Sequence, residues 1–438
     1  MIKSDSRRIK EGDTFIAIKG HREDGHKYIE QAIKKGAKKI IAEYGNYEVE
    51  TIIVEDTKEY YKNYLEQTYK NIINEMTIIG VTGTNGKTTI SYLIYQALNK
   101  LGKKCSMIGT LGYYKEKEEE SLTNTCPDLG IIYELILDSY NSGYKYLVLE
   151  ASSQGLKEGR LYGVKFDYAI FTNLTHDHLD YHKSMNDYLK SKILLFKALK
   201  PNGIGIVNID DKYSKYFTSK NTFTYGFNEC DYQISDCKDY SFKLNDEEVE
   251  INILGKHNAY NITATIIVLD HLKIGIEKIK QIIKELKAPN GRMETYEYKT
   301  NKIIVDYAHT PDAIEKVLNT IKNHKNIYAV FGCTGNRDRL KRPLMTKQLL
   351  DKCTKLIITE DDLYDEDFNH IVEDMIEDQE KDNYEIIEDR KEAINKGIKL
   401  LKENDVLLVL GKGHEKYIKI KNKLVKHNDA ETILNIIK

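Results

Sequence analysis

Thr77-Ile-Ile-Gly-Val-Thr-Gly-Thr-Asn-Gly-Lys-Thr-Thr89 is the stretch around which the chain is organised. Its apolar first half is typical of a buried strand, and its second half is a glycine-rich loop. A helix is predicted to follow, because apolar residues recur at helical spacing up to Leu101 and Gly102 then ends the pattern. Gly83 and Gly86 allow the backbone to approach a bound group, so that N–H donors and the positive end of the helix dipole converge. The stretch therefore predicts an anion site.

Two side chains of this loop suit the phosphates of a nucleotide. Lys87 supplies a full positive charge at the outer phosphates, and the Thr88 hydroxyl lies where a Mg²⁺ ligand is needed. The competing interpretation is a plain strand–turn–helix joint with a surface lysine, which seldom produces Gly-Lys-Thr at this place. The spacing differs from the general pattern G-x-x-x-x-G-K-T, since Val81 stands where the first glycine is expected and Gly80 comes one residue too early.

Length and composition limit the class of protein. With 438 residues the chain has room for about three domains. Its 68 acidic and 66 basic residues nearly cancel, so the net charge gives no reason to expect a nucleic acid or a membrane surface as partner. The first residues contain no apolar signal segment, and no run of about 18 apolar residues follows that would span a bilayer. We therefore expect a cytoplasmic protein without membrane insertion, whose six cysteines are reduced.

Strand and helix signals alternate along the whole chain and divide it into three α/β units. Residues 1–75 are predicted to form a small α/β domain, and residues 76–288 a central P-loop ATPase-like domain with a parallel sheet. The last boundary falls at Ala288-Pro289-Asn290-Gly291, where the apolar patterns are interrupted. Residues 289–438 repeat strand and helix in the order of a Rossmann-like domain.

Polar residues follow two apolar strands of the central unit. Glu150 ends one of them, and ligands of open α/β sheets gather at the carboxyl ends of the strands, so this carboxylate is a candidate Mg²⁺ ligand. A glutamate that caps a neighbouring helix is the alternative. Residues 176–182 contain three histidines and two aspartates, which taken alone would also allow a zinc site.

The ordered motifs resemble the Mur ligase family, whose members join an amino acid to a carboxylate through an acyl phosphate. The phosphate loop has this family's form Gly-x-Thr-Gly-Thr-Asn-Gly-Lys-Thr, and residues 172–182 match Thr-Asn-Leu-x-x-Asp-His-Leu-Asp-x-His. The motifs that are similar to the MurE type, which extends UDP-N-acetylmuramoyl peptides, are Asp-Ser-Arg at 5–7, Gly-His-Arg-x-Asp-Gly-His at 20–26, Gly-Arg-Met-Glu at 291–294, Val-Asp-Tyr-Ala-His-Thr-Pro-Asp at 305–312 and Gly-x-x-Gly-x-Arg-Asp at 332–338.

The resemblance implies an ATP site, two Mg²⁺ sites and a set of catalytic residues. The implied ATP contacts are Gly83, Thr84, Asn85, Gly86, Lys87, Thr88, Thr89, Asn258, Arg292 and Asp306. The implied metal ligands are Thr88, Glu150, His178 and Lys192. Lys192 would act as a carbamate, because a carbamate offers Mg²⁺ the hard oxygen atoms that an amine lacks. The implied catalytic residues are Lys87, Lys192, His178 and Arg337.

The resemblance also implies the residues that bind the substrates, a UDP-N-acetylmuramoyl peptide and a free amino acid. They are Ser6, His21, Arg22, Thr125, Ser152, Arg160, His309, Asp361, Gly411 and Glu415. Where diaminopimelate-adding members read Asp-Asn-Pro-Arg, residues 361–364 read Asp-Asp-Leu-Tyr and lack the arginine that would bind a distal carboxylate. The acidic stretch 360–367 favours a distal ammonium instead. We therefore predict L-lysine or a similar basic amino acid, with a solvated acidic loop as the alternative.

Three departures from the family pattern keep a different acceptor open. The stretch that usually precedes Asp-Ser-Arg is missing, Cys126 replaces a threonine and Gln154 replaces a histidine. The alternative acceptors are a specialised cell-surface precursor and a folate that would be polyglutamylated. The motifs of residues 1–75 argue against the folate. A nucleotide-switch protein of another class would share the phosphate loop, but the guanine motif Asn-Lys-x-Asp is absent. We expect a monomer that binds no nucleic acid.

Overall fold

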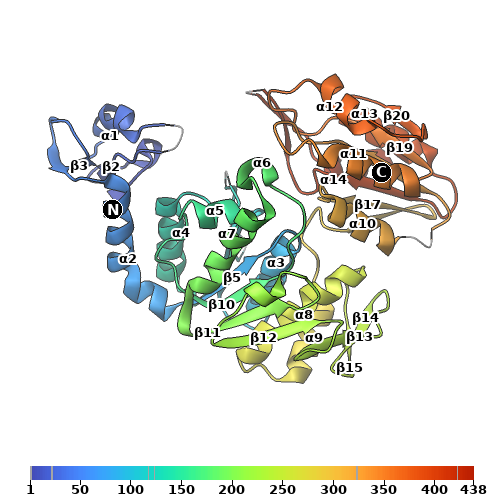
Figure 1. Ribbon diagram of the computed structural model, residues 1–438, viewed down its shortest axis with the longest axis horizontal. Coiled ribbons are helices and arrows are strands. Elements are labelled where there is room, and N and C mark those ends of the chain that lie inside the picture. The colour runs from blue at the N-terminus through green and yellow to red at the C-terminus, as the bar shows by residue number, and fades with distance from the viewer. Residues whose placement is uncertain (1, 21–22, 117, 123, 322–323, 422) are drawn as a thin grey trace.

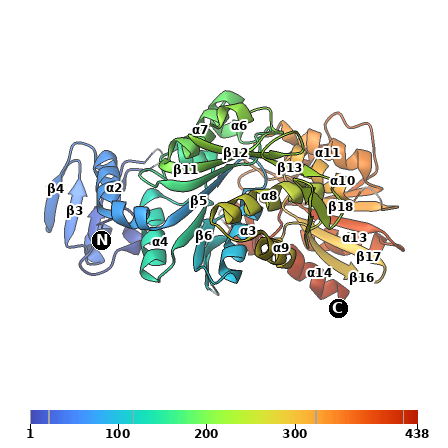
Figure 2. The same ribbon diagram turned by 90° about the horizontal axis from the view of Figure 1, so that it is seen from below.

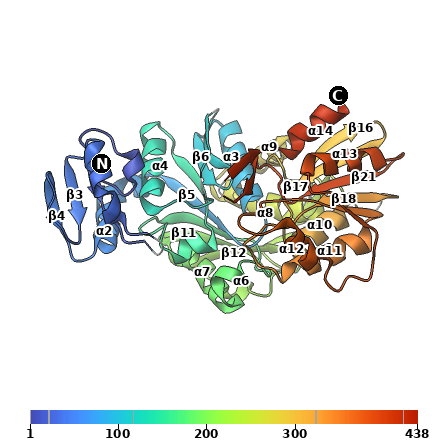
Figure 3. The same ribbon diagram turned by 90° about the horizontal axis from the view of Figure 1, so that it is seen from above.

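The computed structural model describes residues 2–20, 23–116, 118–122, 124–321, 324–421 and 423–438. Three main sheets, each with its own helices, follow one another along the long axis of the molecule (Figure 1). The small amino-terminal sheet lies at one end, the large central sheet in the middle and the carboxy-terminal sheet at the other end, as two further views show (Figure 2 and Figure 3). The predicted α/β class with three domains is confirmed.

The amino-terminal sheet has four parallel strands in the order β1-β2-β3-β4. Phe15 and Ile40 of this sheet bury their side chains against Ala32 of helix α1. The long helix α2 then leads to the central domain, where its apolar face packs in the same core as α4. The bounds are β1 (Ile2–Lys3), η1 (Ser6–Arg8), β2 (Thr14–Ile16), η2 (Gly25–Tyr28), α1 (Ile29–Lys34), β3 (Lys39–Ala42), β4 (Glu50–Ile53) and α2 (Thr57–Glu75).

The central sheet has the order β15-β14-β13-β12-β11-β10-β5-β9-β6-β7-β8. Every neighbouring pair from β13 to β6 is parallel, whereas both edges end in antiparallel strands. Successive residues of β5 face opposite sides: Ile78 lies in the core shared with α2, α4 and α7, and Ile79 in the core shared with α3, α8 and α9.

The elements of the central domain have these bounds: β5 (Thr77–Thr82), α3 (Lys87–Lys100), β6 (Cys105–Gly109), β7 (Gly112–Lys115), β8 (Glu118–Glu120), α4 (Leu129–Asn141), β9 (Tyr146–Glu150), α5 (Ser153–Lys157), β10 (Phe166–Phe171), α6 (Leu179–His182), α7 (Met185–Lys197), β11 (Leu199–Asn208), η3 (Ser214–Tyr216), β12 (Asn221–Gly226), β13 (Tyr232–Ser235), β14 (Ser241–Leu244), β15 (Glu247–Glu250), α8 (Lys256–His271) and α9 (Ile276–Glu285).

The carboxy-terminal sheet has the order β16-β17-β21-β18-β19-β20, in which only β16 is antiparallel to its neighbour. A separate hairpin, β22–β23, follows β21. The bounds are β16 (Glu294–Tyr298), β17 (Asn301–Asp306), α10 (Pro311–Thr320), β18 (Ile327–Phe331), α11 (Lys341–Lys352), β19 (Lys355–Ile358), α12 (Phe368–Ile376), β20 (Tyr384–Ile386), α13 (Arg390–Leu400), β21 (Val406–Leu410), β22 (Tyr417–Ile420), β23 (Lys423–Lys426) and α14 (Asp429–Ile437).

The glycine-rich loop after β5 is fastened to the end of β10. The backbone oxygen of Asn85 accepts hydrogen bonds from Thr172 Oγ1 (2.6 Å) and Asn173 Nδ2 (3.1 Å), and the backbone N–H of Thr84 donates to the Asn173 carbonyl (2.8 Å). Gly83 has φ +145°, and a Cβ atom there would lie 1.8 Å from Thr172 Oγ1. Glycine is therefore required at this crossing of two chain segments.

His182 joins helix α7 to helix α5 in the interior of the central domain. Its side chain is fully buried, with Nε2 2.9 Å from Ser153 Oγ and Nδ1 3.4 Å from Asp187 Oδ2. Burial lowers the pKa of His182 to about 4, although Asp187 opposes the shift. His182 is therefore a neutral part of the packing at neutral pH.

In the part of the chain that the structure describes, no helix combines the length and apolar character needed to cross a membrane.

We expect Gly83→Ala to destabilise the protein more than Gly102→Ala. Both glycines have positive φ, but a Cβ atom at Gly102 meets nothing within 4 Å, so only backbone strain of about 1 kcal/mol is added there. At Gly83 the contact with Thr172 adds to the strain. Thermal unfolding should show the larger loss of Tm for Gly83→Ala, and equal losses would contradict the crowded crossing.

The pH dependence of stability should report the buried His182. Because its folded pKa lies below its ordinary value of 6.5, the unfolded chain takes up the proton first as the pH falls, so stability is complete above pH 6.5 and declines towards pH 4. We expect His182→Gln to remove part of this decline, at most about 3 kcal/mol. Denaturant unfolding at pH 7, 6 and 5 tests this, with His370→Gln at an exposed position of α12 as control.

Candidate active site

The phosphate loop and the start of α3 form a cradle for an anion. Gly86 has φ +89° and is the residue before the first turn of α3, whose free N–H groups point into the loop. The Lys87 ammonium folds back over the loop and donates to the carbonyls of Gly83 (3.0 Å) and Thr84 (2.8 Å). Backbone donors and a lysine held only by carbonyl oxygens fit the phosphates of ATP. Thr89, predicted as a further contact, is buried in the same first turn.

A hydroxyl and a carboxylate suited to Mg²⁺ lie side by side below this loop. Thr88 Oγ1 donates to Glu150 Oε2 at 2.9 Å, and Glu150 is fully buried. The carboxylate also accepts from the backbone N–H (2.9 Å) and the hydroxyl (3.1 Å) of Thr110. These oxygen donors fit a hard divalent cation. Among the described residues no helix cap is formed by the Glu150 side chain, which speaks against the capping alternative.

Lys192 reaches the same loop from the opposite side. It lies on α7 with 1% of its surface exposed, and its Nζ donates to the Gly83 carbonyl at 2.6 Å. The Tyr188 ring lies 4.4 Å from this nitrogen. Burial, helped by the nearby charge of Lys87, lowers the pKa of Lys192 well below its usual value. The amine is therefore easier to deprotonate than a surface lysine, and a deprotonated amine is what reacts with carbon dioxide.

The histidine-rich segment after β10 does not form one metal centre. His176 Nε2 lies 2.7 Å from Asp338, and His178 Nε2 lies 3.4 Å from Asp177 Oδ2. The buried ring of His182, at the end of α6, contacts Ser153 of α5. Among the described residues these rings point to three different partners, which speaks against zinc. His178 has φ +54°, an uncommon conformation for a non-glycine residue that brings its ring beside Asp177.

Two asparagines of α8 face the glycine-rich loop. A Cβ atom at Gly86 would lie 2.8 Å from Asn261 Oδ1, so this amide is in contact with the loop. Asn261 Nδ2 donates to Asn258 Oδ1 (2.8 Å), and Asn258 Nδ2 donates to the Leu254 carbonyl (2.7 Å). The predicted residue Asn258 is thus buried next to the cradle, and Asn261 belongs to the same pair.

Arg292 brings a charge of the carboxy-terminal domain to the phosphate loop. Its Nη2 lies 3.5 Å from Thr88 Oγ1, its guanidinium stacks 4.4 Å from the Tyr307 ring, and its buried Nε has no partner among the described residues. An unpaired buried donor beside the cradle fits a ligand oxygen. Gly291, the preceding residue, packs so tightly on the 413–414 backbone that a Cβ atom would lie 2.1 Å from His414 N.

Asp306, the last residue of β17, and His309, on the loop that follows, both lie near Arg292. Asp306 accepts from the backbone N–H groups of Met293 (2.7 Å) and Ala308 (2.8 Å), and burial raises its pKa. His309 Nδ1 lies 2.7 Å from the Tyr307 carbonyl, and burial lowers the pKa of His309 to about 3. His309 is therefore neutral at pH 7, with Nδ1–H donating to that carbonyl and Nε2 left as an acceptor.

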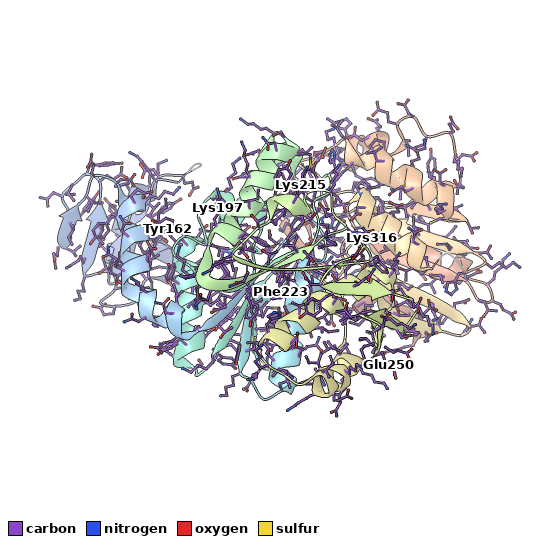
Figure 4. All side chains as sticks on the ribbon, turned by 60° about the horizontal axis from the view of Figure 1, so that its bottom comes forward. Tyr162, Lys197, Lys215, Phe223, Glu250 and Lys316 are labelled. Atoms are coloured by element: carbon purple, nitrogen blue, oxygen red, sulfur yellow. The ribbon has the colours of Figure 1, made fainter. Side chains whose placement is uncertain are left out.

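Direct contacts hold the carboxy-terminal domain against the central one. Asn85 Nδ2 of the phosphate loop donates to Asp312 Oδ2 at 2.6 Å, and Asp312 also pairs with Lys316, which Figure 4 labels where the two domains meet. Beside them, the His176–Asp338 contact crosses between the same domains. The phosphate loop therefore lies at an interface between the central and the carboxy-terminal domain.

The predicted amino-acid residues surround a buried lysine. Lys412 Nζ lies 2.7 Å from Asp362 Oδ1 and 3.8 Å from Asp361 Oδ1, and it pairs with Glu415. Gly411 is close-packed here, since a Cβ atom would lie 2.6 Å from Asp361 Oδ2. The three carboxylates also have the spacing of a metal cluster, but an ammonium already lies among them. Asp361, Gly411 and Glu415 are thus brought together, as their predicted common role requires.

The acidic stretch 360–367 is only partly solvent-exposed: Asp365 and Asp367 are exposed, but other acidic residues are paired. Asp361 and Asp362 are buried on Lys412, and Glu366 pairs with Arg342 at 2.8 Å. Burial raises the pKa of Asp361, while Lys412 opposes that shift. Much of the negative charge that suggests a distal ammonium is therefore already paired within the domain.

Arg337 lies apart from the phosphate cradle. It is exposed, and its guanidinium is 5.7 Å from the Tyr364 ring, on the side of the Lys412 cluster. Among the described residues it makes no salt bridge. Its described contact is thus with Tyr364, which follows the predicted amino-acid residue Asp361 closely in the chain.

The residues predicted for the nucleotide-sugar peptide are divided between two domains. Thr125 Oγ1 contacts Thr110 Oγ1 (2.9 Å), Ser152 caps α5, and Arg160 donates to the Cys126 carbonyl (2.8 Å). Ser6 lies in the amino-terminal domain and donates to Gln31 (2.8 Å). The predicted contacts His21 and Arg22 lie outside the described residues.

Sequence reasoning missed several members of the site. The contacts of Asp177 with Lys341, of Tyr307 with Glu415 and of Asp312 with Asn85 join segments distant in the chain, which spacing alone does not reveal. Asn261 and Lys412 stand close in sequence to the predicted residues Asn258 and Gly411, but no role was predicted for them.

Comparison with known proteins identifies the family over almost the whole chain. Residues 1–75 match the Mur ligase family catalytic domain, residues 81–269 the Mur ligase middle domain, and residues 291–413 the glutamate ligase domain of Mur ligases.

Relatives and solved structures agree with these matches. UDP-N-acetylmuramoyl-L-alanyl-D-glutamate–2,6-diaminopimelate ligases from Clostridium botulinum and Clostridium perfringens are 38% and 36% identical to the chain; the alignments cover 100% of it and 95% and 94% of the relatives. A solved structure of a ligase of that name is 32% identical, with a TM-score of 0.67 over 100% of this chain and 94% of the other. The chain thus belongs to the Mur ligase family and is an ATP-dependent amide-forming ligase of peptidoglycan synthesis.

Proposed function

We propose that the chain adds the third amino acid of the stem peptide to UDP-N-acetylmuramoyl-L-alanyl-D-glutamate. The observation that carries this proposal is the meeting of two half-sites: the phosphate cradle of the central domain faces Arg292, which extends from the carboxy-terminal domain. The names of the relatives, which are similar over the full length, support the acceptor. In this proposal residues 1–75 bind the UDP-sugar, residues 76–288 bind ATP and residues 289–438 bind the amino acid, in a monomer that works in the cytoplasm.

The first step of the proposed reaction activates the acceptor carboxylate. A carboxylate oxygen attacks the γ-phosphorus of ATP, the bond to the bridging oxygen breaks, and ADP leaves with that electron pair. Lys87, Arg292 and the N–H groups at the start of α3 stabilise the charge on the phosphoryl oxygens. Thr88, Glu150, His178 and Lys192 would hold two Mg²⁺ ions, which neutralise phosphate charge when bound.

Lys192 enters this scheme as a carbamate. A buried amine with a lowered pKa is a good nucleophile towards carbon dioxide, and the product replaces a buried cation by an anion with two oxygen atoms. The present contact of Nζ with the Gly83 carbonyl places the group beside the phosphate loop. A carbamate there would offer its oxygen atoms to Mg²⁺.

The second step joins the amino acid. Its neutral amine attacks the acyl carbon, the C–O bond to phosphate breaks, and the phosphate leaves with that electron pair and takes up the proton that the nitrogen loses. Glu415, Asp361 and the Gly411 backbone hold the amino acid next to the buried Lys412. His309 and Arg337 line the route between this cluster and the cradle in the proposed arrangement. Both reaction partners are thus held by different domains, so turnover requires the closed arrangement of the interface.

L-Lysine stays the sequence-based prediction for the added amino acid. Two acidic side chains on which it rests, Asp361 and Asp362, are paired with Lys412, and the cited relatives are named for diaminopimelate. Both amino acids carry a second amino group, so we propose a diamino acid as the substrate class and treat the distal carboxylate as the point on which the two differ.

The proposed acceptor and amino acid are tested by phosphate release from ATP. We expect release to need both UDP-N-acetylmuramoyl-L-alanyl-D-glutamate and a diamino acid, because the acyl phosphate forms on the acceptor and is consumed by the amine. L-Lysine and diaminopimelate are compared at equal concentrations, with dihydrofolate plus glutamate as the control pair. Release that is equally fast without any acceptor contradicts the ligase, and higher efficiency with diaminopimelate contradicts lysine.

The carbamate is tested by depleting bicarbonate. We expect the native enzyme to lose most of its activity in carbon dioxide-free buffer and to regain it when bicarbonate is added. Lys192→Ala should lose about a hundredfold or more in kcat, and bicarbonate should restore nothing, because the ligand oxygens are gone. Lys190→Ala, at an exposed position of the same helix, is the matched control. Full activity of Lys192→Ala would remove the carbamate from the scheme.

A further inference from the structure

One lysine of the carboxy-terminal domain reaches into the central domain. Lys341 is the first residue of α11 and is only 8% exposed. Its Nζ lies 3.4 Å from Asp177 Oδ1, in the segment that follows β10. Neighbouring basic residues do not behave in this way: Arg339 and Arg342 turn back to Asp374 of their own domain, at 2.6 and 2.7 Å.

Lys341 is poorly neutralised where it lies. A buried ammonium usually makes several charge-assisted hydrogen bonds of 2.7–2.9 Å. Within the described residues the Lys341 ammonium has one acidic partner, Asp177, at the longer distance of 3.4 Å. This carboxylate is shared, because His178 Nε2 also lies 3.4 Å from it. Two of the three ammonium donors are therefore free for another acceptor.

The surroundings are rich in positive charge on both sides of the interface. Lys87 approaches the phosphate loop from the central domain, and Arg292 approaches it from the carboxy-terminal domain with a buried Nε that has no partner among the described residues. Within the same part of the chain, the Lys87 ammonium has no carboxylate partner, and Lys341 has Asp177 at 3.4 Å as its carboxylate partner. An anion with several oxygen atoms would complete this arrangement.

A role of Lys341 as a mere clamp between the domains explains the geometry less well. The neighbouring pair His176–Asp338 already joins the same two segments at 2.7 Å, and Asn85–Asp312 joins the domains at 2.6 Å. A clamp at the looser distance of 3.4 Å adds little to these contacts, whereas a lysine held short of its partner can move to a ligand.

We propose that Lys341 is a further catalytic residue whose ammonium binds the phosphoryl group in transfer and stabilises its oxygens, so that the carboxy-terminal domain supplies a cation to the ATP site on closure. The inference rests on the proposed function. As the carboxylate oxygen bonds to the γ-phosphorus and the bond to the bridging oxygen breaks, ADP takes the electron pair and no proton moves. A cation that arrives only in the closed state speeds this step when the amino-acid domain is in place, which limits loss of the acyl phosphate to water.

The test compares Lys341→Met with Lys347→Met, an exposed position of the same helix, and with the charge-keeping Lys341→Arg. With the substrates that the native enzyme uses, we expect Lys341→Met to lower kcat at least about a hundredfold with little change in the KM for ATP, Lys341→Arg to recover part of kcat, and Lys347→Met to behave as native. A clamp would instead raise the KM for the amino acid and spare kcat at saturation.

Calorimetry supplies a readout independent of turnover and of the acceptor. ADP with Mg²⁺ is titrated with and without aluminium fluoride, which imitates the phosphoryl group in transfer. We expect fluoride to tighten ADP binding in native protein and Lys347→Met but not in Lys341→Met, with ADP alone binding equally to all. A kcat of Lys341→Met within threefold of native, or equal tightening in both methionine variants, overturns the proposal; a native enzyme inactive with muramoyl acceptors overturns only the proposed function.

Discussion

The site depends on the parallel, in-register pairing of β5 with its two neighbours. Val81 lies opposite Glu150 of β9, and Thr82 lies opposite Phe171 of β10. The phosphate loop, the Glu150 carboxylate and the histidine-rich segment therefore leave the sheet at one edge. Helices bury both faces of this sheet, and a shift by one residue would turn Glu150 to the other face, so the same packing that stabilises the domain also fixes its chemistry.

Charge is distributed so that neither domain holds a complete site. In the proposed site the central domain contributes Lys87, and the carboxy-terminal domain contributes Arg292 and Lys341. Contacts between the domains, such as Asn85–Asp312 and His176–Asp338, hold these groups close to one another. An anion bound between the domains would attract positive groups of both, which favours their association.

The sequence could predict the parts of the fold that follow from local patterns. Helical spacing after the glycine-rich loop predicts α3, and apolar runs predict β5, β9 and β21. Helices α2 and α4 are not predicted from the sequence. Residues 129–137 of α4 are almost uniformly apolar, because the helix is enclosed between α2 and the sheet, and a uniform run hides the helical period.

The candidate site could be predicted only where a motif marks it. Gly83, Thr88 and Glu150 stand in recognisable segments, and the structure brings them together. Asp177 and Lys341 meet across 164 positions, and nothing in either segment alone announces the contact. For the acidic stretch 360–367 the sequence suggests more free negative charge than the structure has. Lys412 and Arg342, from other parts of the chain, pair with two of its carboxylates.

The close packing of Gly291 on the 413–414 backbone has a mechanical consequence for the connector that precedes it. Gly291 is packed against the last domain, and Arg292, the next residue, extends from there to Thr88. The length of the connector between α9 and Gly291 therefore limits where the last domain, and the Arg292 guanidinium with it, can lie relative to Thr88. Insertion of one residue would lengthen this connector by up to about 3.5 Å. That increase is as large as the 3.5 Å distance between Arg292 Nη2 and Thr88 Oγ1.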